Sequence, residues 1–255
     1  MQIQNSQTIS GDSPFKEIDL HKIKTSCASC SLSELCLPRG MGLGALEKLE
    51  SIVKRAAPLQ KGDVLFRAGD EFKGVYAVRS GLIKVFVTAD DGEEQIVGFF
   101  LPGEMLGLDA VDTQVHACSA VALETSSYCA VPFSELSEIC KEIPELQNQL
   151  FRIMGRELSE ENKMLLTLGK KNSEEKVATF LLTISERYHH LGYSASEFKL
   201  TMSRQEIGNY LGITFETVSR VIGRLQRNGI IKVNRKSIRI IDMVALKNLV
   251  SGCDG

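Results

Sequence analysis

One stretch in the C-terminal quarter of the chain constrains the fold more than any other, because it specifies two short helices and the turn between them. Ser203 and Glu206 have the spacing of a capping box, which marks the start of a helix. Ile207 and Leu211 then share one helix face, and Gly212 follows as a turn residue. Two short helices joined through a glycine turn predict a helix-turn-helix.

The second of these helices is amphipathic. Thr214 can cap its start, and apolar residues then recur at helical spacing, at Val218, Val221, Ile222 and Leu225. The opposite face presents Glu216, Thr217, Ser219, Arg220 and Gly223, with Arg224 nearby. The N-terminal end of a recognition helix reaches base edges in the major groove, where arginine contacts guanine and glutamate accepts from cytosine. We therefore expect Arg220 and Glu216 to read bases.

A β-hairpin is predicted directly after this helix, which Gly229 ends. Two β-rich runs, 230–233 and 238–241, flank the basic turn 234–237, whose place is beside phosphates. Residues 170–255 carry 14 Lys and Arg against 8 Asp and Glu, whereas the rest of the chain carries 16 against 24. A basic segment in an otherwise acidic chain predicts a polyanionic partner, so we expect this segment to bind double-stranded DNA.

Residues 58–135 have a different pattern. Short runs rich in Val, Ile and Phe, such as 74–87 and 94–100, are separated by glycine about every ten residues. This pattern predicts a β-sandwich or β-roll.

A long helix is predicted from Pro144 to about Gly169. Spacings of three and four residues, which are typical of a coiled-coil seam, connect Phe151, Met154, Leu158, Glu161, Leu165 and Leu168. In a symmetric parallel pair the two copies of Glu161 would face and repel each other. The pattern predicts a homodimer that is only marginally stable.

Three of the seven cysteines form a C-x2-C-x5-C motif at Cys27, Cys30 and Cys36, and the others lie far away at Cys118, Cys129, Cys140 and Cys253. Three closely spaced thiols and one distant thiol can supply the four thiolates of a zinc site or an iron–sulfur cluster. Cys140 adjoins the long helix and Cys253 lies in the C-terminal tail, so we expect neither to be the fourth ligand. The spacing separates neither Cys118 from Cys129 nor zinc from iron.

Other function classes find no support in the sequence. It contains no paired carboxylates with a nearby base, no phosphate-binding loop and no nucleophile elbow, so we predict that the chain is not an enzyme. The first residues lack the pattern of a secretory signal, and no apolar run approaches the roughly 18 residues of a membrane span. We expect a cytoplasmic protein with reduced thiols and no membrane partner.

Three strings of residues resemble a known family. They are 27–38 (CASCSLSELCLP), 122–129 (ALETSSYC) and 203–212 (SRQEIGNYLG), the last leading into 216–220 (ETVSR). Across nearly the whole chain they resemble the family of the catabolite activator and the fumarate-and-nitrate-reduction (FNR) regulators, and most of all the FNR branch. Phe215 and Ser219 stand where the catabolite activator type has an arginine and a glycine.

The resemblance implies an α+β fold. Its parts are an N-terminal β-roll sensor domain of the double-stranded β-helix or jelly-roll type, like cyclic-nucleotide-binding domains, a long dimerisation helix and a C-terminal winged helix-turn-helix. The expected division is a cysteine-bearing segment (1–42), the β-roll (43–140), the dimerisation helix (141–170), the DNA-binding domain (171–249) and a tail (250–255).

The resemblance also implies that Cys27, Cys30, Cys36 and Cys129 hold an oxygen-labile [4Fe–4S] cluster, which selects Cys129 over Cys118. In such regulators the intact cluster favours the dimer that binds DNA. Oxygen converts it to [2Fe–2S] and then removes it, and the protein returns toward the monomer. The implied function is oxygen-responsive control of anaerobic gene expression.

The implied partners are a TTGAT…ATCAA-like promoter palindrome and RNA polymerase, with candidate polymerase-contacting loops around residues 71–74. The residues that we expect to contact DNA are Ser203, Arg204, Glu216, Thr217, Ser219, Arg220 and Arg224.

Two alternatives keep the same fold. A cyclic-nucleotide sensor needs a cation for the cyclic phosphate, normally an arginine after the Gly-Glu stretch at 103–107, but residues 115–120 contain none. His116 is a poor substitute for a permanently charged guanidinium. The other alternative is a DNA-binding regulator with a structural zinc site.

Overall fold

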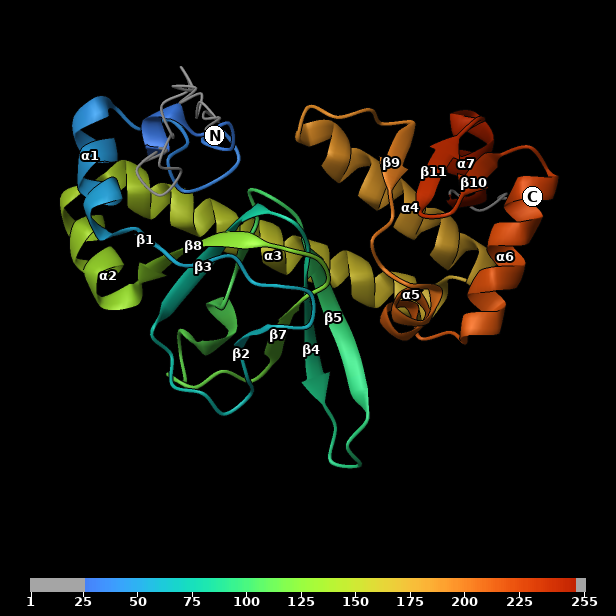
Figure 1. Ribbon diagram of the computed structural model, residues 1–255, viewed down its shortest axis with the longest axis horizontal. Coiled ribbons are helices and arrows are strands. Elements are labelled where there is room, and N and C mark those ends of the chain that lie inside the picture. The colour runs from blue at the N-terminus through green and yellow to red at the C-terminus, as the bar shows by residue number, and fades with distance from the viewer. Residues whose placement is uncertain (1–25, 251–255) are drawn as a thin grey trace, which may run out of the picture.

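The computed structural model describes residues 26–250, and it confirms the predicted fold class. A β-rich domain occupies one end and a smaller helical domain with a short sheet the other, and a single long helix runs between them (Figure 1). Two of the segments named above, the tail after residue 250 with Cys253 and most of the N-terminal segment, lie outside the described residues.

The chain enters the β-rich domain through a short 3-10 turn and a helix. The turn η2 spans Cys27–Ser29, and the helix α1 spans Leu43–Ile52. Leu49 and Ile52 are the buried residues of α1, and they pack against the roll.

The β-roll consists of two four-stranded sheets with the orders β1-β8-β3-β6 and β2-β7-β4-β5. The strands are β1 (Lys54–Arg55), β2 (Val64–Phe66), β3 (Gly74–Ser80), β4 (Ile83–Thr88), β5 (Glu94–Phe100), β6 (Met105–Leu106), β7 (Ser119–Ala122) and β8 (Ser127–Pro132), with the 3-10 turn η3 (Leu108–Ala110) between β6 and β7. The runs predicted at 74–87 and 94–100 are strands, with a turn between β3 and β4.

That turn requires glycine at position 81. Gly81 has a φ of +85°, a region that side chains rarely adopt, and a Cβ there would lie 2.3 Å from the Ser126 hydroxyl oxygen. The close approach lets Ser126 Oγ accept a hydrogen bond from the Leu82 amide across 3.1 Å.

Three consecutive helices follow the roll: α2 (Phe133–Glu142), α3 (Pro144–Lys170) and α4 (Ser173–His190). The long helix has the predicted extent, with proline in its first turn. The sequence analysis did not predict α2, which separates the last strand from α3. An Asn172 capping box starts α4 only two residues after α3 ends.

The C-terminal domain contains the predicted helix-turn-helix and hairpin. Its elements after α4 are β9 (Glu197–Lys199), α5 (Arg204–Leu211), α6 (Phe215–Arg227), β10 (Ile231–Asn234), β11 (Ser237–Ile240) and α7 (Met243–Val250). The Ser203 capping box is formed, and Gly212 ends α5 with a left-handed φ of 60°. Strand β9 was not predicted; it pairs with β11 and completes a three-stranded sheet.

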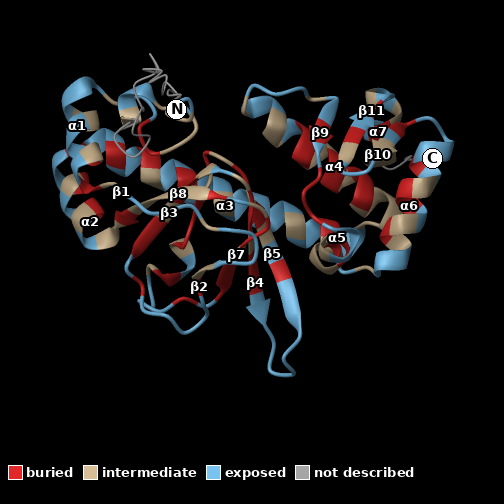
Figure 2. Ribbon diagram, in the orientation of Figure 1, coloured by how far each residue is buried: buried red, intermediate tan, exposed pale blue. Residues whose placement is uncertain are grey.

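The two domains share buried apolar side chains (Figure 2). Six residues of the roll belong to the same cluster as the core of the C-terminal domain: Leu82, Phe86, Ile96, Phe99, Leu101 and Leu123. The second side of the roll packs with α1, α2 and the start of α3 in a separate cluster. The C-terminal domain is therefore packed against the roll and not merely tethered to it.

Glu157 of α3 lies where the two domains meet, beside Glu104 of the roll and Arg187 of α4. Burial raises the pKa of the Glu157 carboxyl to about 7, with repulsion from Glu104 adding to the shift and attraction to Arg187 opposing it. The pKa of an unperturbed glutamate side chain is about 4.3. The folded protein thus holds this proton more tightly than the unfolded chain does.

This shift predicts a pH-dependent effect of Glu157→Gln. Because the folded state binds the extra proton, the free energy of unfolding of the parent falls as the pH rises from about 4.5 to about 7. We expect the variant to exceed the parent by about 1–3 kcal/mol at pH 8, with the gap shrinking toward pH 4.5. Urea unfolding at fixed protein concentration measures both proteins, and a gap independent of pH would contradict the assignment.

Candidate cofactor site and nucleic-acid interface

Four thiols line one small cavity between the N-terminal segment and the roll. Cys27 and Cys30 come from η2 and its end, Cys36 from the turn that follows, and Cys129 from strand β8. The rest of the lining is largely apolar and consists of Leu32, Ser33, Leu37, Pro38, Leu49, Val53, Ala77, Val78, Arg79 and Val131. A strand thus brings the fourth thiol to the motif.

The protein surroundings favour the protonated form of Cys27, Cys36 and Cys129. Burial raises the pKa of Cys36 to about 12, with the neighbouring cysteines adding to the shift. Burial likewise raises the pKa of Cys27 and that of Cys129. A metal group binds thiolates, so its binding here has to release protons and supply positive charge in an apolar place.

Two arginines bring positive charge to Cys129. Arg79 and Arg55 both favour its thiolate and so oppose the rise of its pKa, and Arg55 also hydrogen-bonds to it. Arg55 pairs with Cys129 in the register of β1 with β8. Both cations lie on strands of the same sheet, so the fold fixes them beside this thiol.

A polar network links the motif to Arg55. The Ser26 hydroxyl donates to Glu50 Oε2 across 2.6 Å, and Glu50 Oε1 lies 3.5 Å from the Arg55 guanidinium. The Glu50 carboxylate also accepts a hydrogen bond from the Cys27 amide. Helix α1 therefore holds both the motif and the arginine at Cys129.

The long helix also contacts the motif. Gln149 of α3 is buried, and its Nε2 donates to the Cys36 carbonyl oxygen across 3.1 Å. The cysteine segment is in this way connected directly to the helix that carries the predicted dimer seam.

The donor set fits a group held by four thiolates. Within residues 26–250 no three His, Cys, Asp or Glu side chains are already placed to hold a metal ion, so the thiols line the cavity without forming a closed single-ion shell. Cys118 lies buried in the roll, and Cys140 is buried on α2. Neither of them lines this cavity.

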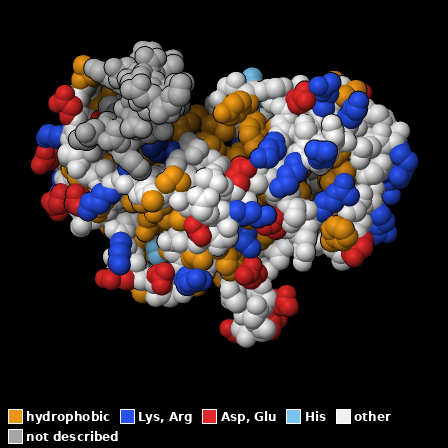
Figure 3. All heavy atoms as spheres, viewed as in Figure 1, with side chains coloured by type: hydrophobic (Ala, Val, Ile, Leu, Met, Phe, Trp, Pro, Cys, Tyr) orange, Lys and Arg blue, Asp and Glu red, His pale blue; other side chains and the backbone are white. Residues whose placement is uncertain are grey.

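Six of the seven predicted DNA-contacting residues lie at the starts of the two helices of the helix-turn-helix, whereas Arg224 lies in the last turn of α6. Arg204 begins α5, and Glu216, Thr217, Ser219 and Arg220 lie in the first two turns of α6. The buried face of α6 consists of the four predicted apolar residues. In the face seen in Figure 3, Lys and Arg side chains gather over the C-terminal part of the molecule.

Several of these side chains already have partners within the chain. Ser203 Oγ accepts from the Glu206 amide, so this hydroxyl caps α5. Arg220 donates to Thr217 Oγ1 across 2.9 Å. Arg224 donates to Glu174 of α4 across 2.9 Å, a contact that the sequence analysis did not anticipate.

Most of the predicted dimer seam lies on the surface of this single chain. Phe151, Leu158 and Leu165 are 59%, 60% and 67% exposed, and Glu161 is exposed among them. Ile153, by contrast, is buried against the roll. Exposed apolar surface of this kind is typical of an interaction surface.

Known protein families match both the β-roll and the helix-turn-helix domain. Residues 57–143 match the family model described as cyclic nucleotide-binding domain, and residues 175–249 match the Crp-like helix-turn-helix domain. The transcriptional activator protein Anr of Pseudomonas protegens is 50% identical over 226 residues, which cover 89% of this chain and 93% of Anr. The chain belongs to the CRP/FNR family of transcription regulators.

Other members of the family are also similar to this chain over most of its length. The fumarate and nitrate reduction regulatory protein of Yersinia pestis is 44% identical, with 88% of this chain and 89% of that protein covered. Among solved structures, FixK2 from Bradyrhizobium japonicum superposes with a TM-score of 0.71 at 30% identity, and the match covers 78% of this chain and 97% of FixK2. Membership of this family confirms the predictions of DNA binding and of a non-enzymatic function, and CRP/FNR regulators act as dimers.

Aromatic rings fill part of the interior of the cyclic-nucleotide-binding-type domain. The imidazole of His116 is buried and stacks on Phe66 with ring centroids 3.9 Å apart, and Phe66 stacks on Tyr76. His116 Nδ1 lies 3.3 Å from Asp109 Oδ1. His116 thus packs as a core residue of the roll.

Among residues 26–250, none of the helices combines the length and the apolar character that spanning a membrane requires.

The Glu50 network predicts that Glu50→Gln loosens the cysteine motif. The substitution weakens the contacts to Ser26 and Cys27 and removes a negative charge that raises the pKa of the Cys27 thiol. Loss of about 1 kcal/mol of hydrogen bonding corresponds to about fivefold more frequent local opening. We expect alkylation of Cys27 in metal-free protein to be about fivefold faster, as measured for each cysteine by mass spectrometry.

Glu47→Gln, an exposed position on the same helix, is the matched control and leaves the rate unchanged. Equal rates in the parent and in Glu50→Gln would show that the network does not restrain the motif.

Proposed function

We propose that this protein is an oxygen-responsive transcription regulator that binds promoter DNA as a dimer while a [4Fe–4S] cluster is intact, and so controls anaerobic gene expression. The observation that carries the proposal is the convergence of the three motif cysteines and Cys129 on one cavity. The names of relatives support it: besides Anr, the anaerobic regulatory protein of Pasteurella multocida is 47% identical over 88% of this chain.

In this proposal Cys27, Cys30, Cys36 and Cys129 hold the cluster. Four thiolates are the usual ligands of [4Fe–4S] clusters, and the cluster supplies an oxygen-sensitive metal centre. The same donors suit zinc, but a single zinc ion needs four sulfur atoms about 2.3 Å from the metal. The relatives named as anaerobic regulators favour the cluster over zinc.

The cysteine assignment is tested by comparing Cys129→Ala with Cys118→Ala, both prepared without oxygen. We expect Cys129→Ala to lose most of its iron and acid-labile sulfide, because one ligand of the cavity is gone. Cys118→Ala retains the content of the parent, since Cys118 lies elsewhere in the roll. Equal retention in both variants would contradict the role of Cys129, and stoichiometric zinc in the parent would replace the cluster with a structural ion.

We further propose that α3 dimerises through Phe151, Met154, Leu158, Glu161, Leu165 and Leu168. The exposed apolar residues of this stripe favour association, and the paired Glu161 carboxylates oppose it. In this proposal the repulsion weakens the dimer, so that a modest change at the cluster shifts the equilibrium. The contact of Gln149 with Cys36 supports transmission along α3.

The proposed repulsion between the two Glu161 carboxylates predicts that Glu161→Ala dimerises more readily than the parent when the cluster is absent. Removing the repulsion of two facing carboxylates favours the apo dimer by about 0.5–1 kcal/mol, or roughly two- to fivefold in its dissociation constant. Sedimentation of the metal-free protein measures the effect. Glu160→Ala, outside the stripe, is the control, and unchanged dimerisation of apo Glu161→Ala would remove this explanation.

The reading of DNA is assigned to Ser203, Arg204, Glu216, Thr217, Ser219, Arg220 and Arg224, on a TTGAT…ATCAA-like palindrome. The exposed side chains of Glu216 and Arg220 support this assignment, because that end of a recognition helix reaches base edges. The Ser219 hydroxyl, in contrast, is buried without a hydrogen-bond partner within the chain, so it has to turn outward to reach DNA. The basic hairpin turn between β10 and β11 is assigned to phosphate contacts.

Arg220→Ala is expected to lower the affinity for the palindrome about 5- to 150-fold and to relax preference at one base pair, because a bidentate guanine contact is lost. Lys232→Ala, on the hairpin, should instead weaken binding evenly across sequences and reduce its salt dependence. Fluorescence anisotropy with single-base variants of the site distinguishes these outcomes. An even loss for Arg220→Ala would show that it contacts only the backbone.

RNA polymerase is the proposed protein partner, with the loop at residues 71–74 between β2 and β3 as candidate contact. A protein that works on promoters with this enzyme is placed in the cytoplasm. We also keep the proposed division into a cysteine-bearing segment, β-roll, dimerisation helix and DNA-binding domain, with α2 at the end of the roll.

A further inference from the structure

The helix-turn-helix is fastened to the roll through Asn209, near the end of α5. Asn209 Oδ1 accepts from the Ile96 amide and Asn209 Nδ2 donates to the Glu94 carbonyl, both across 2.6 Å. The Gln95 side chain donates to the Asn209 carbonyl across 2.7 Å. One asparagine therefore binds three consecutive residues of β5, in the way that an additional strand would.

A second polar contact joins α4 to the same side of the roll. Arg187 Nε donates to Glu104 Oε1 across 2.8 Å. Arg187 Nη2 donates to both Glu104 Oε2 and the Phe99 carbonyl oxygen. The turn that carries Glu104 is itself fixed, because Glu104 Oε2 also accepts from the Leu101 amide. Both side chains of this ion pair are three-quarters buried, which limits screening by solvent.

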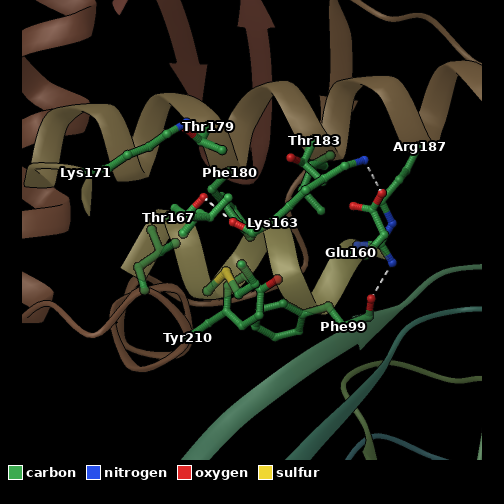
Figure 4. A pocket seen from close by; sticks show the side chains of 14 residues that line it. Phe99, Glu160, Lys163, Thr167, Lys171, Thr179, Phe180, Thr183, Arg187 and Tyr210 are labelled. Atoms are coloured by element: carbon green, nitrogen blue, oxygen red, sulfur yellow. Dashed lines mark hydrogen bonds and ion pairs between the residues drawn. The ribbon is translucent and has the colours of Figure 1, made fainter. Parts of the chain in front are cut away.

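Apolar packing at this junction is incomplete. Phe99, Phe180 and Tyr210 form a cluster with ring centroids 5.1–6.3 Å apart. Beside it lies a cavity of about 290 Å³ between α3, α4 and α5, into whose lining Arg187 and Tyr210 extend (Figure 4). Directional polar contacts therefore add to the shared apolar packing in fixing the orientation of the C-terminal domain.

The short connection between α3 and α4 does not by itself fix the orientation of the C-terminal domain. Only Lys171 and Asn172 separate α3 from α4, and both have extended backbone conformations, with ψ angles of 144° and 172°. Rotation about two such residues can swing the whole C-terminal domain relative to α3.

The junction lies away from the predicted dimer seam. Nine positions separate Leu158 of the seam from Thr167 of the cavity lining, which is about two and a half turns at 3.6 residues per turn. Leu158 and Thr167 thus face opposite sides of α3, whereas Leu168, at the C-terminal end of the seam, lies one turn beyond Met164 of the lining and beside Gly212. Most of the seam therefore faces away from the junction. The contacts described here can therefore persist in a dimer.

We propose that Asn209 and the Arg187–Glu104 pair form an interdomain clamp that fixes each recognition helix relative to the dimer axis and thereby sets the spacing of the two DNA half-sites. This inference rests on the proposed function, because it takes the DNA-binding form to be a dimer on a palindrome. In such a dimer the two recognition helices enter successive major grooves about 34 Å apart, so their separation determines which spacer fits. The clamp residues are positioning residues and do not contact DNA.

The test measures affinity, without oxygen, for a series of palindromes whose spacer is shortened or lengthened by one or two base pairs, and for a single half-site. The parent should show a sharp optimum at one spacer. Asn209→Ala and Glu104→Gln, each made separately, should lose about tenfold affinity at that optimum and change less than about twofold at the other spacers. Their affinity for the half-site should be unchanged.

Glu124→Gln is the matched control. Glu124 pairs with Lys199 across the same two domains, but the lysine is 60% exposed, so this pair should contribute little. Sedimentation and thermal unfolding identify any variant that fails to fold or dimerise, and the second clamp variant then supplies the test.

The outcomes separate the clamp from the function on which it rests. A parent that binds no palindrome overturns the proposed function. A parent with a sharp optimum and clamp variants with the same spacer profile overturn the clamp alone. Tighter binding of the variants at the optimum also overturns it, since the contacts would then hold a conformation that opposes DNA binding.

Discussion

Four thiols around one largely apolar cavity cannot all lose their protons unless positive charge is supplied in the same place. Here burial raises the pKa of Cys36 to about 12, and Arg55 and Arg79 favour the thiolate of Cys129. Two arginines do not balance four thiolates, so the proposed metal group would bring the remaining charge. The attachment of the motif to the roll also involves polar contacts, among them that of Ser26 with Glu50.

This electrostatic requirement is connected to the rest of the molecule through α3. Gln149 touches the cysteine segment at one end of the helix, and the cavity beside the DNA-binding domain lies against its other end. Between them runs an exposed apolar stripe interrupted by Glu161. The same helix therefore meets the cofactor site, the proposed partner chain and the domain junction, which gives a small structural change at the thiols a physical route to DNA.

The sequence predicted best what is determined locally. Ser203 and Gly212 fix the helix-turn-helix through a cap and a left-handed turn, and both are formed as expected. The fourth thiol was different: spacing left Cys118 and Cys129 equal, and only the family resemblance chose between them, because strand pairing decides which one reaches the cavity. Helix α2 and strand β9 were missed, the latter because three residues carry little pattern of their own. The roles of Asn209 and its contacts to β5 depend on how two domains pack, and no local pattern encodes them.

In the proposed function, an oxygen-sensitive metal group at the four thiols controls association of the chain. The most direct measurement records the visible absorption spectrum and the sedimentation of one sample, purified without oxygen, while air is titrated in. We expect a broad absorption band that changes shape and then bleaches, with dimer converting to monomer in step. A colourless protein containing stoichiometric zinc, or a dimer that persists after the band has bleached, would contradict it.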